Sequence, residues 1–87
     1  MKILLIEDEP KVSSFIKKGL EEQNYEVDQA YDGNFGVKMA LQHDYDLIIL
    51  DIILPHMNGL DFCREIRKQN SMVSILMLTA LGSTDDK

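Results

Sequence analysis

The sequence predicts an α/β fold with a doubly wound parallel sheet, and three observations support this prediction. Short apolar runs alternate with helical patterns in the order β-α-β-α-β-α-β. The segments between the runs are long enough for helices, which join parallel strands through right-handed crossovers. Three of the four runs lack polar alternation, which is typical of strands that are covered on both faces of a sheet.

The first strand and helix occupy the N-terminal quarter of the chain. An apolar run, Lys2 to Ile6, predicts a strand and ends at three consecutive acids. Pro10 follows them, and proline suits the first turn of a helix, where its missing N–H would have no partner. The pattern predicts a helix that ends at Asn24, because apolar residues then recur at helical spacing, at Val12, Phe15, Ile16 and Leu20.

A weaker strand and a second helix come next. Tyr25 to Ala30 alternates only weakly, which predicts a half-exposed edge strand. Asp32-Gly33 is a turn signal, and Phe35 to His43 is predicted to be helical. Leu47 to Leu50 is apolar throughout and predicts an interior strand.

The last third of the chain continues the alternation. Asn58-Gly59 is predicted to open a third helix, and Ser74 to Ala80 to form a fourth strand, followed by a polar end over 81–87. The runs at 3–6, 47–50 and 75–78 are therefore predicted to be the interior strands.

The composition excludes several classes of protein. The chain has 87 residues, of which 45% are hydrophobic and 28% charged, as in an ordinary globular domain. The formal net charge of −6 argues against direct binding of nucleic acid or of an anionic membrane. One cysteine fits a reducing compartment. There is no signal-peptide pattern and no apolar run of membrane-spanning length, so we expect a cytoplasmic location.

Acidic residues stand where two of the predicted strands end. Glu7 and Asp8 follow the first strand and Asp51 follows the third, while Thr79 and Ala80 end the fourth. Ligands bind beyond the carboxyl ends of the strands in such sheets. Clustered carboxylates repel, and a hard divalent cation such as Mg²⁺ makes their proximity tolerable. A carboxylate beside Mg²⁺ can attack phosphorus and become an aspartyl phosphate.

Each of these residues also has a simpler structural interpretation. The acids before Pro10 could complement a helix dipole. Asp51 could be a cap or turn residue before Pro55, and Thr79 could be one more β-branched strand residue. Their joint placement at three strand ends of one predicted sheet favours the functional interpretation.

Three stretches give the chain a family resemblance. MKILLIEDEP, YDLIILDIILPHMNGLDFCREIR and SILMLTA together resemble the receiver domain of bacterial two-component response regulators. The resemblance is strongest to the transcription factors that carry a C-terminal winged-helix DNA-binding domain. It implies a flavodoxin-like sheet with strand order 2-1-3-4, incomplete because the fifth strand and the last two helices of the family are missing.

The resemblance also implies roles for individual residues and for a cation, Mg²⁺ or another divalent ion such as Mn²⁺. Asp51 would be the phosphoacceptor and a metal ligand, Asp8 a direct ligand, and Glu7 a ligand that acts mainly through water. The remaining implied roles are the metal-binding backbone carbonyl of Ile53, the switch hydroxyl of Thr79, and the phosphate-binding backbone N–H of Ala80.

The implied partner is a sensor histidine kinase that donates a phosphoryl group. Such kinases usually dock near the first helix, here at Val12, Phe15 and Ile16. Residues 1–87 would form a single truncated receiver domain without its effector domain. Any contact with DNA would then be made only through that absent domain.

Truncation leads to two expectations. The family's phosphate-binding Lys is missing, so we expect Mg²⁺ to bind but phosphorylation to be slow or undetectable. Residues 74–80 would form an exposed apolar edge, and one face of the first and third strands would be uncovered, so we expect self-association.

Competing functions remain open. One is a receiver-like interaction module that is not phosphorylated. An aspartate-based phosphotransferase is disfavoured, because its second Asp would stand where this chain has Ile53. A nucleotide-binding domain is disfavoured by the absence of a glycine-rich phosphate loop. We therefore expect a regulatory domain rather than an enzyme.

Overall fold

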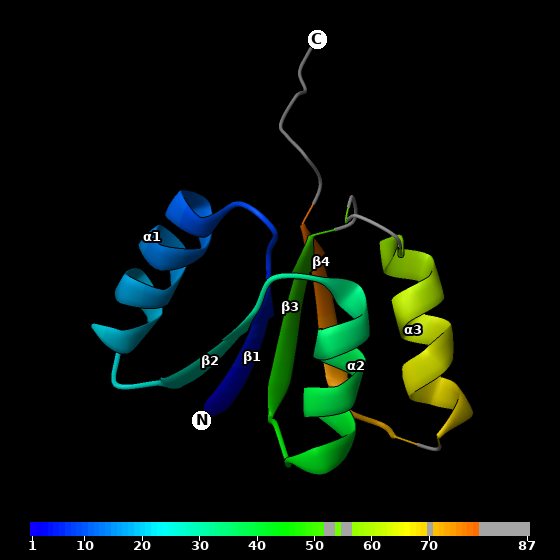
Figure 1. Cartoon of the computed structure of the whole chain (residues 1–87). Helices are drawn as coiled ribbons and strands as arrows, with labels where there is room; N and C mark the ends of the chain where they lie inside the picture. The colour runs from blue at the N-terminus through cyan, green and yellow to red at the C-terminus, as the bar shows by residue number, and fades with distance from the viewer. Residues whose placement is uncertain (52–53, 55–56, 70, 79–87) are drawn as a thin grey trace, which may run out of the picture.

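The computed structural model confirms the predicted alternation of strands and helices (Figure 1). It describes residues 1–51, 54, 57–69 and 71–78. The order of the elements is β1 (Lys2–Ile6), α1 (Pro10–Glu21), β2 (Glu26–Ala30), α2 (Gly33–Gln42), β3 (Leu47–Asp51), α3 (Gly59–Lys68) and β4 (Ser74–Leu78).

The four strands form one parallel sheet in the order β2-β1-β3-β4. This order confirms the strand order implied by the family resemblance, and β2 lies at an edge as its weak alternation predicted. The pattern-based prediction that 75–78 is an interior strand was wrong for the described part of the chain, where β4 pairs with β3 alone, as the family strand order had implied. Apolar residues on both faces indicate that helices cover a strand, and they do not indicate that both of its edges are hydrogen-bonded.

Helices cover both faces of the sheet (Figure 1). On one face α1 contributes Ile16 and Leu20 to a small core, and on the other α2 and α3 pack over a larger core that includes Phe62 and Ile66. The small core contains Ile3, Leu5, Val27 and Ile49, and the larger one contains Leu4, Ile6, Ala30, Ile48 and Leu50.

One predicted surface is not found among the residues that the structure describes. We expected an uncovered face on the first and third strands, but Ile3, Leu5 and Ile49 are only 1%, 0% and 6% exposed. They are buried because Ile16, Leu20 and the neighbouring strand residues Leu47 and Leu78 pack around them. The other expected surface is found in the described residues, because β4 lies at the edge of the sheet and its Leu76 is 50% exposed.

The helix boundaries follow from local sequence. Pro10 opens α1, and Asn24 follows its end with a positive φ of 68°, a conformation that asparagine tolerates well. The side chain of Asp32 caps α2 by accepting a hydrogen bond from the N–H of Phe35 at 2.7 Å. Asn58 caps α3 in the same way, as the Asn58-Gly59 signal predicted.

Candidate functional site

Three carboxylates converge at the carboxyl ends of β1 and β3. Glu7 and Asp8 come directly after β1, and Asp51 is the last residue of β3. The two strands are neighbours in register, with Ile6 opposite Leu50, so their ends lie together. One carboxylate oxygen from each of the three acids lies within 4.8 Å of the others. The structure therefore brings together the three acids that the sequence predicted as a metal site.

The three acids differ in their exposure to solvent. Glu7 is buried, with 6% of its surface exposed, whereas Asp51 is half-buried and Asp8 is exposed. Burial raises the pKa of Glu7 from its ordinary 4.5 to about 7, and the nearby carboxyls of Asp51 and Asp8 contribute to the rise. The backbone N–H of Glu9, which donates to Glu7 Oε2 at 3.1 Å, acts in the opposite direction. Glu7 is the member of the cluster whose charge is most costly without a cation.

The donor set fits a hard divalent cation. All three side chains offer oxygen, the ligand that Mg²⁺ prefers, and a site with few carboxylates leaves room for the waters that Mg²⁺ retains. The raised pKa of Glu7 follows from its burial and from the neighbouring carboxyls of Asp51 and Asp8. Glu7, Asp8 and Asp51 are the residues that would hold such an ion.

Three predicted site residues lie outside the described part of the chain. They are Ile53, Thr79 and Ala80. The roles that the family resemblance implies for their backbone or side chains stay predictions.

The predicted docking face on α1 is accessible. Phe15 is 79% exposed and Val12 42% exposed, while Ile16 is half-buried because it also packs against the small core. Phe15 and Ile16 line a largely apolar surface groove of about 470 Å³. The other residues of this groove are Lys18, Gly19, Leu20 and Glu22. An exposed phenylalanine beside a groove is typical of a protein contact surface.

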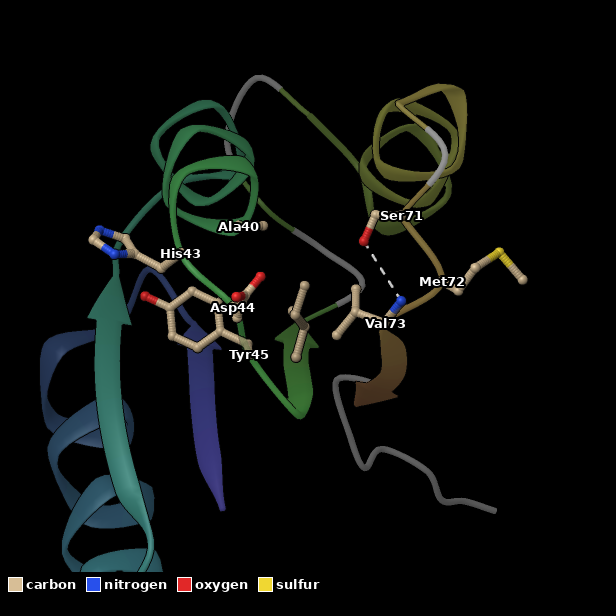
Figure 2. Close-up of a pocket in the computed structure, with 8 residues that line it drawn as sticks. Ala40, His43, Asp44, Tyr45, Ser71, Met72 and Val73 are labelled. Carbon is tan, nitrogen blue, oxygen red and sulfur yellow. Dashed lines mark hydrogen bonds between the residues drawn. The ribbon is translucent and has the colours of Figure 1, made fainter.

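A second cavity, of about 250 Å³, lies at the opposite end of the sheet, where β3 and β4 begin (Figure 2). Tyr45 closes one side of it, and its hydroxyl donates to Asp28 at 2.7 Å. Burial and this hydrogen bond raise the pKa of Tyr45. Ser71 and Val73 line the other side and are joined by a hydrogen bond. The Tyr45 bond joins the segment before β3 to strand β2, and the cavity lies away from the acidic cluster.

Sequence reasoning missed how deeply Glu7 is buried and how α1 is anchored. Ser13 is fully buried in α1, and its hydroxyl accepts a hydrogen bond from Gln29 of β2 at 2.7 Å. A serine on a helix and a glutamine on an edge strand carry no pairing signal in a single sequence. By contrast, the three consecutive acids at the end of the first strand did signal the site.

Comparisons with known proteins agree with this geometry. The family model described as the response regulator receiver domain matches residues 3–87. The response regulator ArlR of Staphylococcus saprophyticus is 50% identical over 86 residues, which are 99% of this chain and 39% of that protein. ArlR of Staphylococcus aureus is 49% identical over 85 residues, 98% of this chain and 38% of the relative. The chain thus spans less than half the length of the curated relatives it matches.

Solved structures show the same fold. The response regulator TrrA from Thermotoga maritima, in complex with Mg²⁺ and BeF, has a TM-score of 0.87 and 40% identity over 93% of this chain and 70% of that one. A structure of histidine kinase ThkA in complex with TrrA gives a TM-score of 0.86 and 37% identity over 99% of this chain and 74% of the matched chain.

A parallel α/β sheet with acids at adjacent strand ends places the chain in the same fold class as the matched response regulator structures. The chain belongs to the response regulator receiver domain family. In the described part of the chain, no helix is long and apolar enough to cross a membrane.

Proposed function

We propose that this chain is the phosphoryl-accepting domain of a two-component signalling system and that Asp51 is the acceptor. The observation that carries the proposal is the cluster of Glu7, Asp8 and Asp51 at the ends of β1 and β3. Asp51 is half-buried at the end of its strand, so its carboxylate is held by the sheet and still reachable from solvent.

The proposed transfer is a displacement at phosphorus. A carboxylate oxygen of Asp51 forms the new O–P bond as the bond from phosphorus to a donor histidine nitrogen breaks, and the imidazole keeps the electron pair. Glu7 and Asp8 hold a divalent cation, Mg²⁺ or Mn²⁺, beside the acceptor. When bound, that cation neutralises charge on the transferred group. The buried carboxyl of Glu7 contributes its charge to the site only when it is ionised.

The proposed donor is a phosphohistidine of a sensor kinase that docks on α1. Phe15, Val12 and Ile16 supply the exposed apolar contact. The complex of ThkA with TrrA supports this proposal, because a kinase of that kind binds a regulator similar to this chain. Control of transcription through a DNA-binding domain, in the cytoplasm, belongs to the same proposal.

Chemical phosphorylation of the 87-residue chain tests the acceptor. The chain is incubated with a small-molecule acyl phosphate and Mg²⁺, and intact mass spectrometry then measures the added phosphoryl group. We expect slow, cation-dependent modification of the wild-type chain and none in Asp51→Asn. Asp61→Asn is the matched control, because Asp61 lies on the surface of α3 and pairs with Arg64. Modification at a different residue would overturn the assignment. Mg²⁺ binding without any modification would fit the low competence expected of the truncated domain, and it would equally suit an unphosphorylated interaction module.

A further inference from the structure

A polar pair of side chains lies inside the apolar contact between α1 and the sheet. Gln29 of β2 shares a face of the sheet with Val27, two residues earlier, and it pairs in register with Leu5. Val27 and Leu5 belong to the small core that α1 covers. On α1, Ser13 is fully buried, and Gln29 Nε2 donates to its hydroxyl at 2.7 Å. Replacing both partners of such a bond with apolar groups of similar shape can be nearly neutral for stability, so the packing of α1 does not by itself require this pair.

Further hydrogen bonds connect the pair to the acidic cluster. The N–H of Ser13 donates to the carbonyl of Glu9, one helical turn earlier, at 2.9 Å. The N–H of Glu9 donates in turn to Oε2 of Glu7 at 3.1 Å. The N–H of Glu7 donates to the carbonyl of Ala30 at 3.0 Å, and Ala30 follows Gln29 on β2. The bonds therefore form a closed ring that begins and ends on β2 and includes the carboxylate of Glu7.

The position of α1 determines where the N–H of Glu9 lies. Glu9 is the N-cap residue of α1, and Pro10, whose φ is fixed by its ring, joins it to the rest of the helix. A helix displaced along β2 would therefore carry this N–H away from the Glu7 carboxylate. Apolar contacts are non-directional and oppose such a displacement only weakly. The bond between Ser13 and Gln29 is directional, and it ties the first turns of α1 to one residue of β2.

We propose that Ser13 and Gln29 are positioning residues of the cation site. Their hydrogen bond sets the first turn of α1, and the N–H of Glu9 then holds the Glu7 carboxylate in the orientation that binds Mg²⁺. This inference rests on the proposed function, because it requires that the acidic cluster hold a divalent cation. Mutating residues that orient metal ligands typically weakens metal binding by roughly 10–100-fold. Ser13 and Gln29 act on Glu7 through Glu9, so we expect an effect of about tenfold.

Titration of the 87-residue chain with Mg²⁺ alone, followed by amide NMR, tests the inference through the Kd. Gln29→Met removes the hydrogen-bonding group and keeps a side chain of similar length, and it should weaken Mg²⁺ binding about tenfold. Ser13→Ala should have a similar effect. The double variant should bind no more weakly than either single variant, because all three lack the same bond.

Tyr45→Phe is the matched control. It also removes a side-chain hydrogen bond of 2.7 Å to β2, but from the opposite end of the sheet. We expect it to lower the free energy of unfolding and to leave the Kd for Mg²⁺ within twofold of the wild type. Urea unfolding compares the stability of the variants, and circular dichroism checks that each is folded during the titration.

Spectra recorded without Mg²⁺ give a second readout, which a loss of stability alone would not change. The amide proton of Glu9 should move upfield in Gln29→Met, because its hydrogen bond to Glu7 lengthens, and should keep its wild-type shift in Tyr45→Phe. An unchanged Kd and an unchanged Glu9 shift in Gln29→Met would overturn this inference alone, and this variant decides the outcome even if Ser13→Ala fails to fold. A wild-type chain that binds no Mg²⁺ would overturn the proposed cation site itself, and this inference with it.

Discussion

Glu7 and Asp51 hold carboxylate oxygens within 4.8 Å of each other although they leave different strands of the sheet. Their proximity follows from the pairing of β1 with β3, which is stabilised by the apolar residues that precede both acids. The folded protein therefore concentrates negative charge at the carboxyl ends of β1 and β3. The free-energy cost of that charge depends on bound cations and on pH.

Magnesium should stabilise the fold. An ion that binds only the folded state raises the free energy of unfolding by about 2.7 kcal/mol at a hundredfold excess over its Kd. We expect Asp8→Asn and Asp51→Asn to lose most of this gain, because each removes a ligand oxygen charge. Asp44→Asn, at the opposite end of the sheet, should keep it. Urea unfolding with and without Mg²⁺ measures the difference, and equal gains in all variants would contradict the site.

The pH dependence of the free energy of unfolding should show the raised pKa of Glu7. Its pKa is raised from 4.5 to about 7, so below pH 4.5 the carboxyl is protonated in both the folded and the unfolded chain. As pH rises from 4.5 to 7 without divalent cations, the unfolded chain ionises first, and the free energy of unfolding should fall by on the order of 2 kcal/mol. Glu7→Gln should remove this part of the fall. Chemical unfolding of the wild type and of Glu7→Gln at several pH values tests this expectation. The same pH dependence of the free energy of unfolding in both proteins would contradict the raised pKa of Glu7.

Alanine substitutions at two glycines should change the free energy of unfolding in opposite directions. A Cβ at Gly19 meets no atom within 4 Å, so Gly19→Ala should stabilise the chain by about 1 kcal/mol through helix propensity. At Gly36 a Cβ would lie 2.5 Å from Cδ1 of Ile6, so Gly36→Ala should destabilise the chain. Urea unfolding compares the two variants. A loss of stability in Gly19→Ala would mean that its helix tolerates no added side chain.

Removing the Tyr45 hydroxyl should lower the free energy of unfolding, because this hydroxyl joins the segment before β3 to the edge strand β2. The hydroxyl donates to Asp28 on β2 from a largely buried ring, and Tyr45→Phe should cost about 1 kcal/mol. Tyr25→Phe, at a more exposed position, serves as the control. Thermal unfolding measures both changes. Equal effects would show that the bond to Asp28 contributes nothing specific.

Docking on α1 can be separated from stability. Phe15 is 79% exposed, so Phe15→Ala should leave the free energy of unfolding within about 0.5 kcal/mol of the wild type. The same variant should slow transfer from a phosphorylated sensor kinase and leave modification by a small-molecule acyl phosphate unchanged. Leu41→Ala, on α2, is the exposed apolar control. A loss of both reactions would place Phe15 in the fold or in the acceptor site.

Much of the architecture could be predicted because periodicity reports which faces of an element are buried. The runs at 3–6 and 47–50 became the central strands, and the acids after the first of them became the site. The strand order came from the family resemblance, since apolar pattern does not specify lateral neighbours. This is also why the apolar pattern alone placed β4 in the interior, whereas the family strand order placed it at the edge where the described residues have it. Asp51 proved to be the last residue of β3, one position inside the strand predicted to end at Leu50.

The parts that could not be predicted are tertiary in origin. The burial of Glu7 depends on tertiary packing at the end of β1, where the backbone N–H of Glu9 also donates to its carboxylate. The anchoring of Ser13 by Gln29 depends on which strand α1 crosses. Neither arrangement has a signature in residue spacing.

Asp51 and Leu78 are paired neighbours in the sheet, so the end of β4 lies next to the proposed phosphoacceptor. Leu78 is the last described residue of β4 and lies directly beside the proposed acceptor. A phosphoryl group adds a charge of about −1.5 to −2, and its field extends over a Debye length of about 8 Å at physiological ionic strength. The end of β4 therefore lies within the direct electrostatic reach of the proposed acceptor.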